Sequence, residues 1–302
     1  MSTAPEMHSI ASDGSIAPPW GAHRPTGGRA VWIKLGQSTP LGKGSLRRTW
    51  VRHLRKESPL VDLELAGAKL RLHLGDNRSE IKALQQSDRF MRDERDVIRT
   101  ASSGQGDEPV YIVDIGANAG LFTAMAGAEL KARAHVLAVE PNPVLLARLT
   151  DNSTLSTAAR IEVAAVAIGG DDGEMELAYR SDDLGGASMA KGQLEGDLHH
   201  IRVPVKTLAS LLDTVGFPRV DIMKIDVEGF EDQALLPFFE TTDPALWPKV
   251  ILMEIAHQAR WSVPLVNLLK TAGYRAEKDD GSADIQLYLD EPGAWPGQGA
   301  TG

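Results

Sequence analysis

Two short segments place glycines and polar residues directly after apolar runs, where a ligand pocket can form. Residues 113–120, VDIGANAG, end an apolar run in a glycine-bounded turn, and residues 136–141, VLAVEP, repeat the pattern with Glu140 at the end. Glycines let the backbone approach a ligand closely, and the N–H groups that begin a following helix can bind its polar atoms. An acidic residue ending the next strand can accept hydrogen bonds from a ribose diol. The pattern therefore predicts a pocket for an adenosine-type ligand.

The middle of the glycine turn decides between ligands of this type. A dinucleotide fingerprint, GxGxxG, needs its second glycine to clear space for a pyrophosphate, but this chain has Asn118 at that position. An asparagine disfavours NAD and can hydrogen-bond a small polar group, while Asp114 supplies a carboxylate suited to an ammonium group. S-adenosylmethionine has an amino-acid end and a ribose but no phosphate, so it satisfies both. Glu140 would then hold the ribose hydroxyls, with the apolar segment 164–168 beside the adenine.

A second group of polar residues lies in the segment KIDVEG, residues 224–229. Asp226 ends a predicted strand and Glu228 begins the next helix, so both carboxylates reach the rim beside the first strand if the sheet order reverses there. Carboxylates in that place can hold a substrate hydroxyl, accept its proton or bind a divalent cation. The structural alternative is helix capping by Asp226 and Glu228. Lys224 is costly to bury in mid-strand unless an acid pairs with it.

The third candidate for a general base is His257, which lies three residues after Glu254 at the rim of another strand. We expect Asp226, Glu228 and His257 to be the catalytic residues. In the alternative, Asp226, Glu228 and Glu254 share a Mg²⁺ ion that lowers the pKa of a bound hydroxyl. We favour the metal-free interpretation.

These motifs require strands and helices that alternate along the chain. From residue 110 onward, apolar segments recur at the spacing of βαβ units. The predicted strands cover residues 110–115, 135–140, 160–168, 220–226, 249–255, 273–277 and 285–289. The predicted helices cover residues 119–132, 143–152, 207–215, 229–239 and 262–272. Runs such as YIVDI and VILMEI indicate strands buried on both faces, so the sequence predicts an α/β fold with a doubly wound, Rossmann-like sheet.

The main domain is expected at residues 106–290, with an inserted hairpin at about residues 174–206. The glycine-rich loop at residues 183–196 can fold over the substrate as a lid, although a loose insertion fits this composition equally well. Residues 1–29 and 291–302 are rich in glycine, proline and small residues. We expect both tails to be disordered.

An N-terminal subdomain of α+β type is expected at residues 30–105. Alternating apolar and polar residues on both sides of residues 66–68 predict a hairpin. The arginine-rich stretch at residues 47–56 is more typical of a solvated helix face than of an anchor for an acidic substrate or partner.

A long helix is predicted after this hairpin. The segment DNRSE at residues 76–80 starts it, and it runs to Ile98. Either Asp76 or Asn77 can accept backbone N–H bonds at its start, and Glu80 is placed to complete a capping box.

The composition excludes several classes of protein. A chain of 302 residues, of which 42% are apolar, can bury a full-sized core. The net charge of −9 argues against sequence-independent binding of nucleic acid or of an anionic membrane. No stretch approaches the ~20 apolar residues of a membrane span, and the N-terminus lacks the blocks of a signal peptide. The absence of cysteine excludes disulfides and thiolate metal sites, and we expect a cytoplasmic protein.

The combined motifs resemble the FkbM-like family of S-adenosylmethionine-dependent methyltransferases. The resemblance covers about residues 110–258. It depends on the segments DIGANAG, VEPNP, AAVAIGGDDG, VPVKTL, and MKIDVEGFE followed by ILMEI and His257. It implies a class I methyltransferase sheet whose last strand is antiparallel. The cofactor contacts that we expect are Asp114, Gly116, Asn118, Gly120, Glu140, Asn142 and Ala167.

The resemblance also implies O-methylation of a hydroxyl on a sugar, glycolipid or natural product. Alignment of the two reactants can supply ~7 to 11 kcal/mol of the barrier, whereas a general base contributes about 10²- to 10⁴-fold. The acceptor is then a small molecule, and the N-terminal subdomain serves either in its pocket or in a homodimer. Two other functions remain open. One is a non-catalytic binding protein on a retained methyltransferase fold, and the other is an NAD-dependent oxidoreductase, which Asn118 disfavours.

Overall fold

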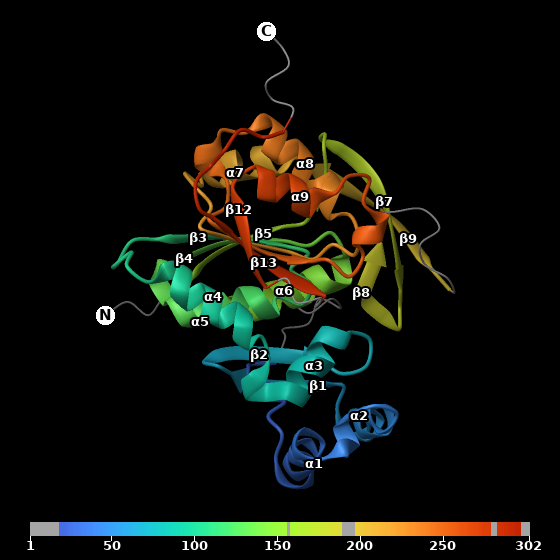
Figure 1. Cartoon of the computed structure of the whole chain (residues 1–302). Coiled ribbons are helices and arrows are strands. Elements are labelled where there is room, and N and C mark those ends of the chain that lie inside the picture. Colours follow the sequence, from blue (N-terminus) through green and yellow to red (C-terminus); the bar gives the residue numbers. More distant parts are fainter. Residues whose placement is uncertain (1–17, 156–157, 189–196, 279–282, 297–302) are drawn as a thin grey trace, which may run out of the picture.

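The large domain is built on a seven-stranded sheet, which Figure 1 shows above a smaller N-terminal unit. The computed structural model describes residues 18–155, 158–188, 197–278 and 283–296. The strands of the large sheet are β3 (Val110–Ile115), β4 (Ala134–Val139), β5 (Arg160–Ala164), β10 (Ile222–Ile225), β11 (Val250–Glu254), β12 (Tyr274–Lys278) and β13 (Asp284–Leu289). Their order is β5-β4-β3-β10-β11-β13-β12.

The order of the strands reverses beside β3. The chain runs from β3 outward through β4 to β5, then returns to place β10 on the other side of β3. All of these strands run parallel except β13, which is antiparallel to both of its neighbours. The predicted doubly wound sheet with an antiparallel last strand is therefore confirmed. Such a reversal opens a crevice at the carboxyl ends of the two central strands, where ligands bind in open α/β sheets.

Helices cover both faces of this sheet, which explains why its central strands β3, β4, β10 and β11 are mostly apolar. One face carries α7 (Leu208–Val215), α8 (Glu231–Thr241) and α9 (Leu265–Thr271). The other face carries α4 (Arg92–Ser102), α5 (Leu121–Leu130) and α6 (Pro143–Thr154). Neighbouring residues of a strand point to opposite faces. In β3, for example, Val113 packs in the cluster of α7 to α9 and Ile112 in that of α4 and α5.

A second, smaller sheet corrects part of the sequence prediction. The single strand expected at residues 160–168 is divided between β5 and β6 (Ala167–Ile168), because β6 pairs with β9 (His199–Lys206) instead of extending the large sheet. The predicted hairpin is formed by β7 (Gly173–Arg180) and β9, which pair antiparallel. The first part of the predicted loop forms β8 (Asp183–Ser188), which pairs with β7. Residues 189–196 lie outside the described residues.

The N-terminal unit packs its core directly on the large domain. It contains α1 (Gly27–Ser38), α2 (Leu46–Glu57), β1 (Leu60–Leu65), β2 (Ala68–His73) and α3 (Arg78–Gln86). The strands β1 and β2 form the predicted hairpin. Buried residues of this unit such as Trp50 and Leu72 share one apolar cluster with Leu121 and Met125 of α5. The unit therefore depends on α5 to complete its core.

The predicted single helix that begins in residues 76–80 and runs to Ile98 is wrong, and so is its predicted capping box. The segment is broken into α3 and α4 by a 3-10 turn at Ser87–Arg89, and Met91, just before α4, has a left-handed φ of 48°. Asn77 does cap α3, accepting from the N–H of Ser79 at 2.9 Å. Glu80, however, does not complete a capping box, because its carboxylate accepts from the N–H of His73 and binds Arg148 of α6.

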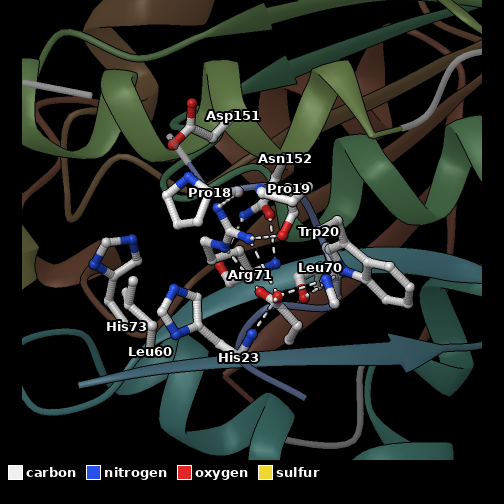
Figure 2. A network of polar contacts seen from close by, with 12 residues as sticks. Pro18, Pro19, Trp20, His23, Leu60, Leu70, Arg71, His73, Asp151 and Asn152 are labelled. Carbon is white, nitrogen blue, oxygen red and sulfur yellow. Dashed lines mark hydrogen bonds and ion pairs between the residues drawn. The ribbon is translucent and has the colours of Figure 1, made fainter. Parts of the chain in front are cut away.

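The prediction of a disordered N-terminal tail is wrong for residues 18–29. Figure 2 shows Arg71 of β2 donating hydrogen bonds to the carbonyl oxygens of Pro18 and Pro19. Arg71 also forms a buried ion pair with Asp62, which accepts from the N–H of His23. An arginine that is 8% exposed needs acceptors for its guanidinium, and this segment supplies two of them. Residues 1–17 lie outside the described residues.

The expected C-terminal tail is likewise ordered at its start. Trp295 is only 2% exposed and stacks on Phe239 of α8, with 4.9 Å between the ring centroids. The buried tryptophan stabilises the position of this segment, because its large apolar surface is removed from water. Residues 297–302 lie outside the described residues.

Candidate functional site

A cavity of about 560 Å³ opens at the carboxyl ends of β3, β10 and β11. The glycine turn after β3 lines one side of it through Gly116, Ala117 and Asn118. The floor includes the acidic residues Asp226, Glu228 and Glu254 together with Lys224. The N-terminal unit closes the remaining side through α3 and the segment that leads into α4. Gly116 and Asn118 of the first predicted group and Asp226 and Glu228 of the second therefore line one cavity. Asp114 and Asn142 do not line it.

Gly116 lets the glycine turn lie directly against the end of β10. Its φ is +75°, and an added Cβ would lie 2.0 Å from the carbonyl oxygen of Asp226. The N–H groups of Gly116 and Ala117 both donate to the carbonyl of Val139, each at 3.0 Å. The turn is thus anchored to β4 on one side and packed on Asp226 on the other.

Glu140, which directly follows β4, fixes the shape of the same turn through hydrogen bonds. Its carboxylate accepts from the N–H of Asn118 at 2.9 Å and from the N–H of Asn142 at 2.8 Å. Asn118 has a left-handed φ of 56°, which the hydrogen bond to Glu140 helps to hold. Burial raises the pKa of Glu140 to about 7, opposed by these two hydrogen bonds. Glu140 is 5% exposed, and the structure does not bring it into the lining of the cavity.

Two buried polar atoms at this edge have no hydrogen-bond partner among the described residues. Asp114 is fully buried, and only its Oδ2 is satisfied, by the hydroxyl of Thr123 at 2.6 Å. Asn142 uses its Oδ1 to cap α6 but leaves its Nδ2 without an acceptor. Burial raises the pKa of Asp114, while nearby Lys224 lowers it. Because buried polar groups are rarely left unpaired, the edge fits a ligand that both donates and accepts hydrogen bonds.

The remaining predicted cofactor residues have structural contacts. Gly120 begins α5 with φ +77°, and an added Cβ would lie 2.7 Å from Leu149 of α6. Ala167 is buried in a small apolar cluster with Leu177 and Val203 of the second sheet. Neither residue lines the cavity.

Asn77 connects the N-terminal unit to the glycine turn, which the sequence analysis did not foresee. Its side-chain amide donates to Oδ1 of Asn118, while its own Oδ1 caps α3. The neighbouring Asp76 accepts from the N–H of Leu184 in β8 through its carbonyl. Segments far apart in the sequence therefore meet at Asn118. The cap signal at Asn77 was visible in the sequence, but its long-range partner was not.

We predict that Asn77→Ala weakens binding of an adenosyl ligand more than it weakens the fold. The change removes the donor that holds Asn118 and one helix cap, which together contribute about 1–2 kcal/mol. Calorimetric titration with S-adenosylhomocysteine should show about tenfold weaker binding. Thr207 offers a comparison, because Thr207→Ala removes the cap of α7, which has no contact with Asn118. Equal affinity of Asn77→Ala and wild type would contradict this role.

Three carboxylates at the carboxyl ends of β10 and β11, Asp226, Glu228 and Glu254, form what we call the acidic rim. This rim contains groups suited to proton transfer near neutral pH. Nε2 of His257 lies 3.0 Å from Oε2 of Glu228, and Nζ of Lys224 lies 3.5 Å from Oδ2 of Asp226. Burial, followed by the charge of Asp226, raises the pKa of Glu228 to about 7 and that of Glu254 to about 8. Asp226 and Asp114 raise the pKa of Lys224 against the effect of its burial. A carboxylate with a pKa near 7 is an effective general base.

The alternative metal site has a different composition from the one predicted. Ligand atoms of Glu228, Glu254 and His257 lie within 4.8 Å of one another, whereas the sequence grouped Asp226 with the two glutamates. His257 itself does not line the cavity, but it contacts Glu228, which does.

Glu231 positions Glu228 and was missed by the sequence analysis. Its buried carboxylate accepts from the N–H groups of Val227 and Gly229, at 3.0 and 3.2 Å, and from the indole of Trp261. These bonds hold the loop in which Glu228 has a left-handed φ of 56°. An acidic residue in the first turn of a helix was the available signal, but it is equally typical of a simple cap.

The raised pKa values of Glu228 and Glu254 predict that the protein loses stability as pH rises. An unfolded glutamate releases its proton near pH 4.3, so between about pH 5 and 8 the folded state binds more protons than the unfolded state. The free energy of unfolding then falls with increasing pH through this window. Thermal unfolding measured in the presence of a chelator should show a lower Tm at about pH 8 than at about pH 5.5. Glu254→Gln should flatten this dependence, and an equal slope in both proteins would contradict the assignment.

Comparisons with known proteins identify the family of this chain. Residues 114–276 match the family described as the methyltransferase FkbM domain. A curated relative, the hexuronic acid methyltransferase AglP of Haloferax volcanii, is 27% identical over 149 residues, which are 49% of this chain and 57% of the relative. The alignment therefore spans little more than half the length of that relative.

Two solved structures of methyltransferases are also similar to this chain. The METTL16 MTase domain has a TM-score of 0.45 at 11% identity, and the match covers 93% of this chain and 85% of that one. A precorrin-6y C5,15-methyltransferase from Geobacter metallireducens has a TM-score of 0.39 at 15% identity, with coverages of 65% and 88%.

Proposed function

Because this chain belongs to the FkbM methyltransferase family and has the class I methyltransferase fold, we propose that it transfers a methyl group from S-adenosylmethionine to a hydroxyl oxygen of a sugar. The observation that carries the proposal is the shared cavity, in which the glycine turn after β3 faces the acidic rim after β10. One wall is suited to an adenosyl ligand and the other to a hydroxyl group. No helix in the described part of the chain is long and apolar enough to cross a membrane.

The donor is held by the glycine turn and by the polar atoms behind it. Gly116 and Asn118 line the cavity and contact the donor there. The unpaired Oδ1 of Asp114 is an acceptor for its ammonium group, and the unpaired Nδ2 of Asn142 is a donor to its ribose or base. Glu140 acts on the donor through the turn, because its carboxylate holds the N–H groups of Asn118 and Asn142 in place. The bound donor supplies an activated methyl group, so the protein need not activate it.

The acidic rim orients the acceptor and takes its proton. Asp226 accepts a hydrogen bond from the acceptor, and Glu228 removes the proton of the reacting hydroxyl. Glu228 suits this role because its pKa of about 7 keeps a large part of it ionised at neutral pH. Burial and the charge of Asp226 raise that pKa, and His257 and Glu231 fix the geometry. Holding two reactants in line supplies ~7 to 11 kcal/mol, which exceeds the contribution of the base.

The name of the curated relative supports a sugar as acceptor, since AglP is described as a hexuronic acid methyltransferase. The test is transfer of a labelled methyl group from S-adenosylmethionine to hexoses, uronic acids and sugar phosphates, with NMR identification of the product. The proposal expects the label in a methoxy group. A label on nitrogen or carbon would contradict O-methylation while leaving methyl transfer in place.

A further inference from the structure

Cationic side chains gather on the wall of the cavity that the N-terminal unit provides. Arg78, Lys82 and Gln86 follow at intervals of four residues along α3 and all line the cavity. Residues at this spacing lie on one face of a helix. Arg89, at the end of the 3-10 turn after α3, and Arg92, the first residue of α4, continue the same lining. We call Arg78, Lys82, Arg89 and Arg92 the cationic wall.

Among the side chains that the structure describes, one member of the cationic wall forms an ion pair. Arg78 forms an ion pair with Asp183 of β8 at 2.8 Å, although its side chain is 82% exposed. Lys82, Arg89 and Arg92 are exposed and form no ion pair with any side chain that the structure describes.

The carboxylates that also line the cavity are separated from the cationic wall or are already engaged. The rim residues Asp226, Glu228 and Glu254 follow β10 and β11. Asp93 and Asp284 have partners of their own, and Glu94 lies near Lys224, whose pKa it raises. The cavity is therefore lined both by the cationic wall, from α3 to the start of α4, and by the carboxylates that follow β10 and β11.

This arrangement is unfavourable in the absence of an anion. Like charges four residues apart on a helix destabilise it by about 0.2–0.5 kcal/mol. The chain as a whole carries a net charge of −9, so the cationic wall is not part of a generally basic surface. Guanidinium groups bind carboxylate and phosphate through paired, charge-assisted hydrogen bonds. An anionic group bound at this wall would offset the repulsion.

We propose that the methyl acceptor is an acidic sugar whose anionic group binds Lys82, Arg89 and Arg92. The reacting hydroxyl then faces Glu228 across the cavity. A volume of about 560 Å³ accommodates such a molecule beside the donor. The inference rests on the proposed function for the sugar and the reaction, and it adds the charge of the acceptor. It assigns the role of recognising an acid to α3 and the segment after it, whereas the arginine-rich α2 does not line the cavity.

The test compares D-glucuronate, D-glucose 6-phosphate and D-glucose as ligands of the protein saturated with S-adenosylhomocysteine. We expect at least one acidic sugar to bind about tenfold more tightly than glucose, as one charge-assisted contact provides. Preference for glucuronate identifies a carboxylate, and preference for glucose 6-phosphate identifies a phosphate. Added salt should reduce the preference, because the contacts are exposed to solvent.

A charge-matched pair of variants separates local recognition from the effect of net charge. Lys82→Glu with Arg89→Glu should abolish the preference for the acidic sugar. Arg47→Glu with Arg48→Glu changes the net charge equally on the exposed α2 and should retain the preference. Equal affinity for all three sugars, no sugar binding, or equal loss in both double variants would overturn the inference. Binding of S-adenosylhomocysteine is measured first, so its absence would contradict the proposed function instead.

Discussion

Replacing Glu228 by glutamine is expected to lower the rate constant of methyl transfer by about 10²- to 10⁴-fold, the usual contribution of a general base. Glutamine keeps the size and the left-handed backbone of the site but cannot accept the proton. Affinity for S-adenosylhomocysteine should be unchanged, because the described contacts of Glu228 are made with His257 and Arg260 and not with the glycine turn. Single-turnover transfer to the identified acceptor measures this step.

The pH dependence of the rate provides a check on the same residue. In the wild-type protein the rate should rise with pH as Glu228 loses its proton around its pKa of about 7, and then level off. Glu228→Gln should lose this rising limb. Glu174→Gln, which changes an exposed side chain near the start of β7, serves as a control for removal of one charge. A wild-type rate in the Glu228→Gln protein would contradict the role of Glu228 and indicate Asp226 as the proton acceptor.

Replacing Gly116 by alanine is expected to abolish adenosyl binding and to destabilise the fold severely. The added Cβ would lie 2.0 Å from the carbonyl oxygen of Asp226, which is backbone and cannot rotate away. The left-handed conformation alone costs about 1–2 kcal/mol with a side chain. The collision must in addition separate β10 from the glycine turn, and overpacking of this kind costs a further 1–3 kcal/mol or so. Thermal unfolding and calorimetry with S-adenosylhomocysteine measure the two effects.

Gly216 offers a matched control for that substitution. It has φ +71°, nearly the same as Gly116, but nothing lies within 4 Å of an added Cβ. Gly216→Ala should therefore show only the conformational cost of about 1–2 kcal/mol, with unchanged affinity for the ligand. Similar losses in both variants would show that strain alone, and not the contact with Asp226, accounts for the effect.

The large domain was predictable because its signals are local. The central strands of the large sheet are short, mostly apolar runs, and the predicted bounds of β3 agree with the structure. The division of residues 160–168 between two sheets was not predictable. It depends on Val205 pairing with Ala167, and a continuous apolar run does not show which partner each half will take.

The N-terminal unit was harder to predict because its order comes from distant partners. Pro18 and Pro19 look like residues of a loose tail, yet they accept hydrogen bonds from Arg71. Glu80 has the spacing of a capping box, but Arg148 lies 68 residues later in the chain and takes its carboxylate instead. Residue propensity and spacing describe only the contacts between neighbours in the sequence. The order of the tail and the role of Glu80 both depend on tertiary contacts.

The candidate site was only partly visible in the sequence for the same reason. The glycine turn and Asp226 lie at strand ends, which a strand prediction alone brings to one edge of the sheet. Asn77 and Lys82 belong to another unit. Asn77 reaches Asn118, and Lys82 reaches the cavity, only because α3 packs beside α5 through a shared core. The role of Glu231 depends on where its carboxylate points, and the sequence carries no such information.

The most direct test of methyl transfer from S-adenosylmethionine is calorimetric titration of the purified protein with that donor and with S-adenosylhomocysteine, using NAD as the control. The structure predicts micromolar binding of both adenosyl ligands and no binding of NAD, because Asn118 occupies the position that a pyrophosphate requires. Binding of NAD in preference to the adenosyl pair, or binding of neither in a folded sample, would contradict the proposed function.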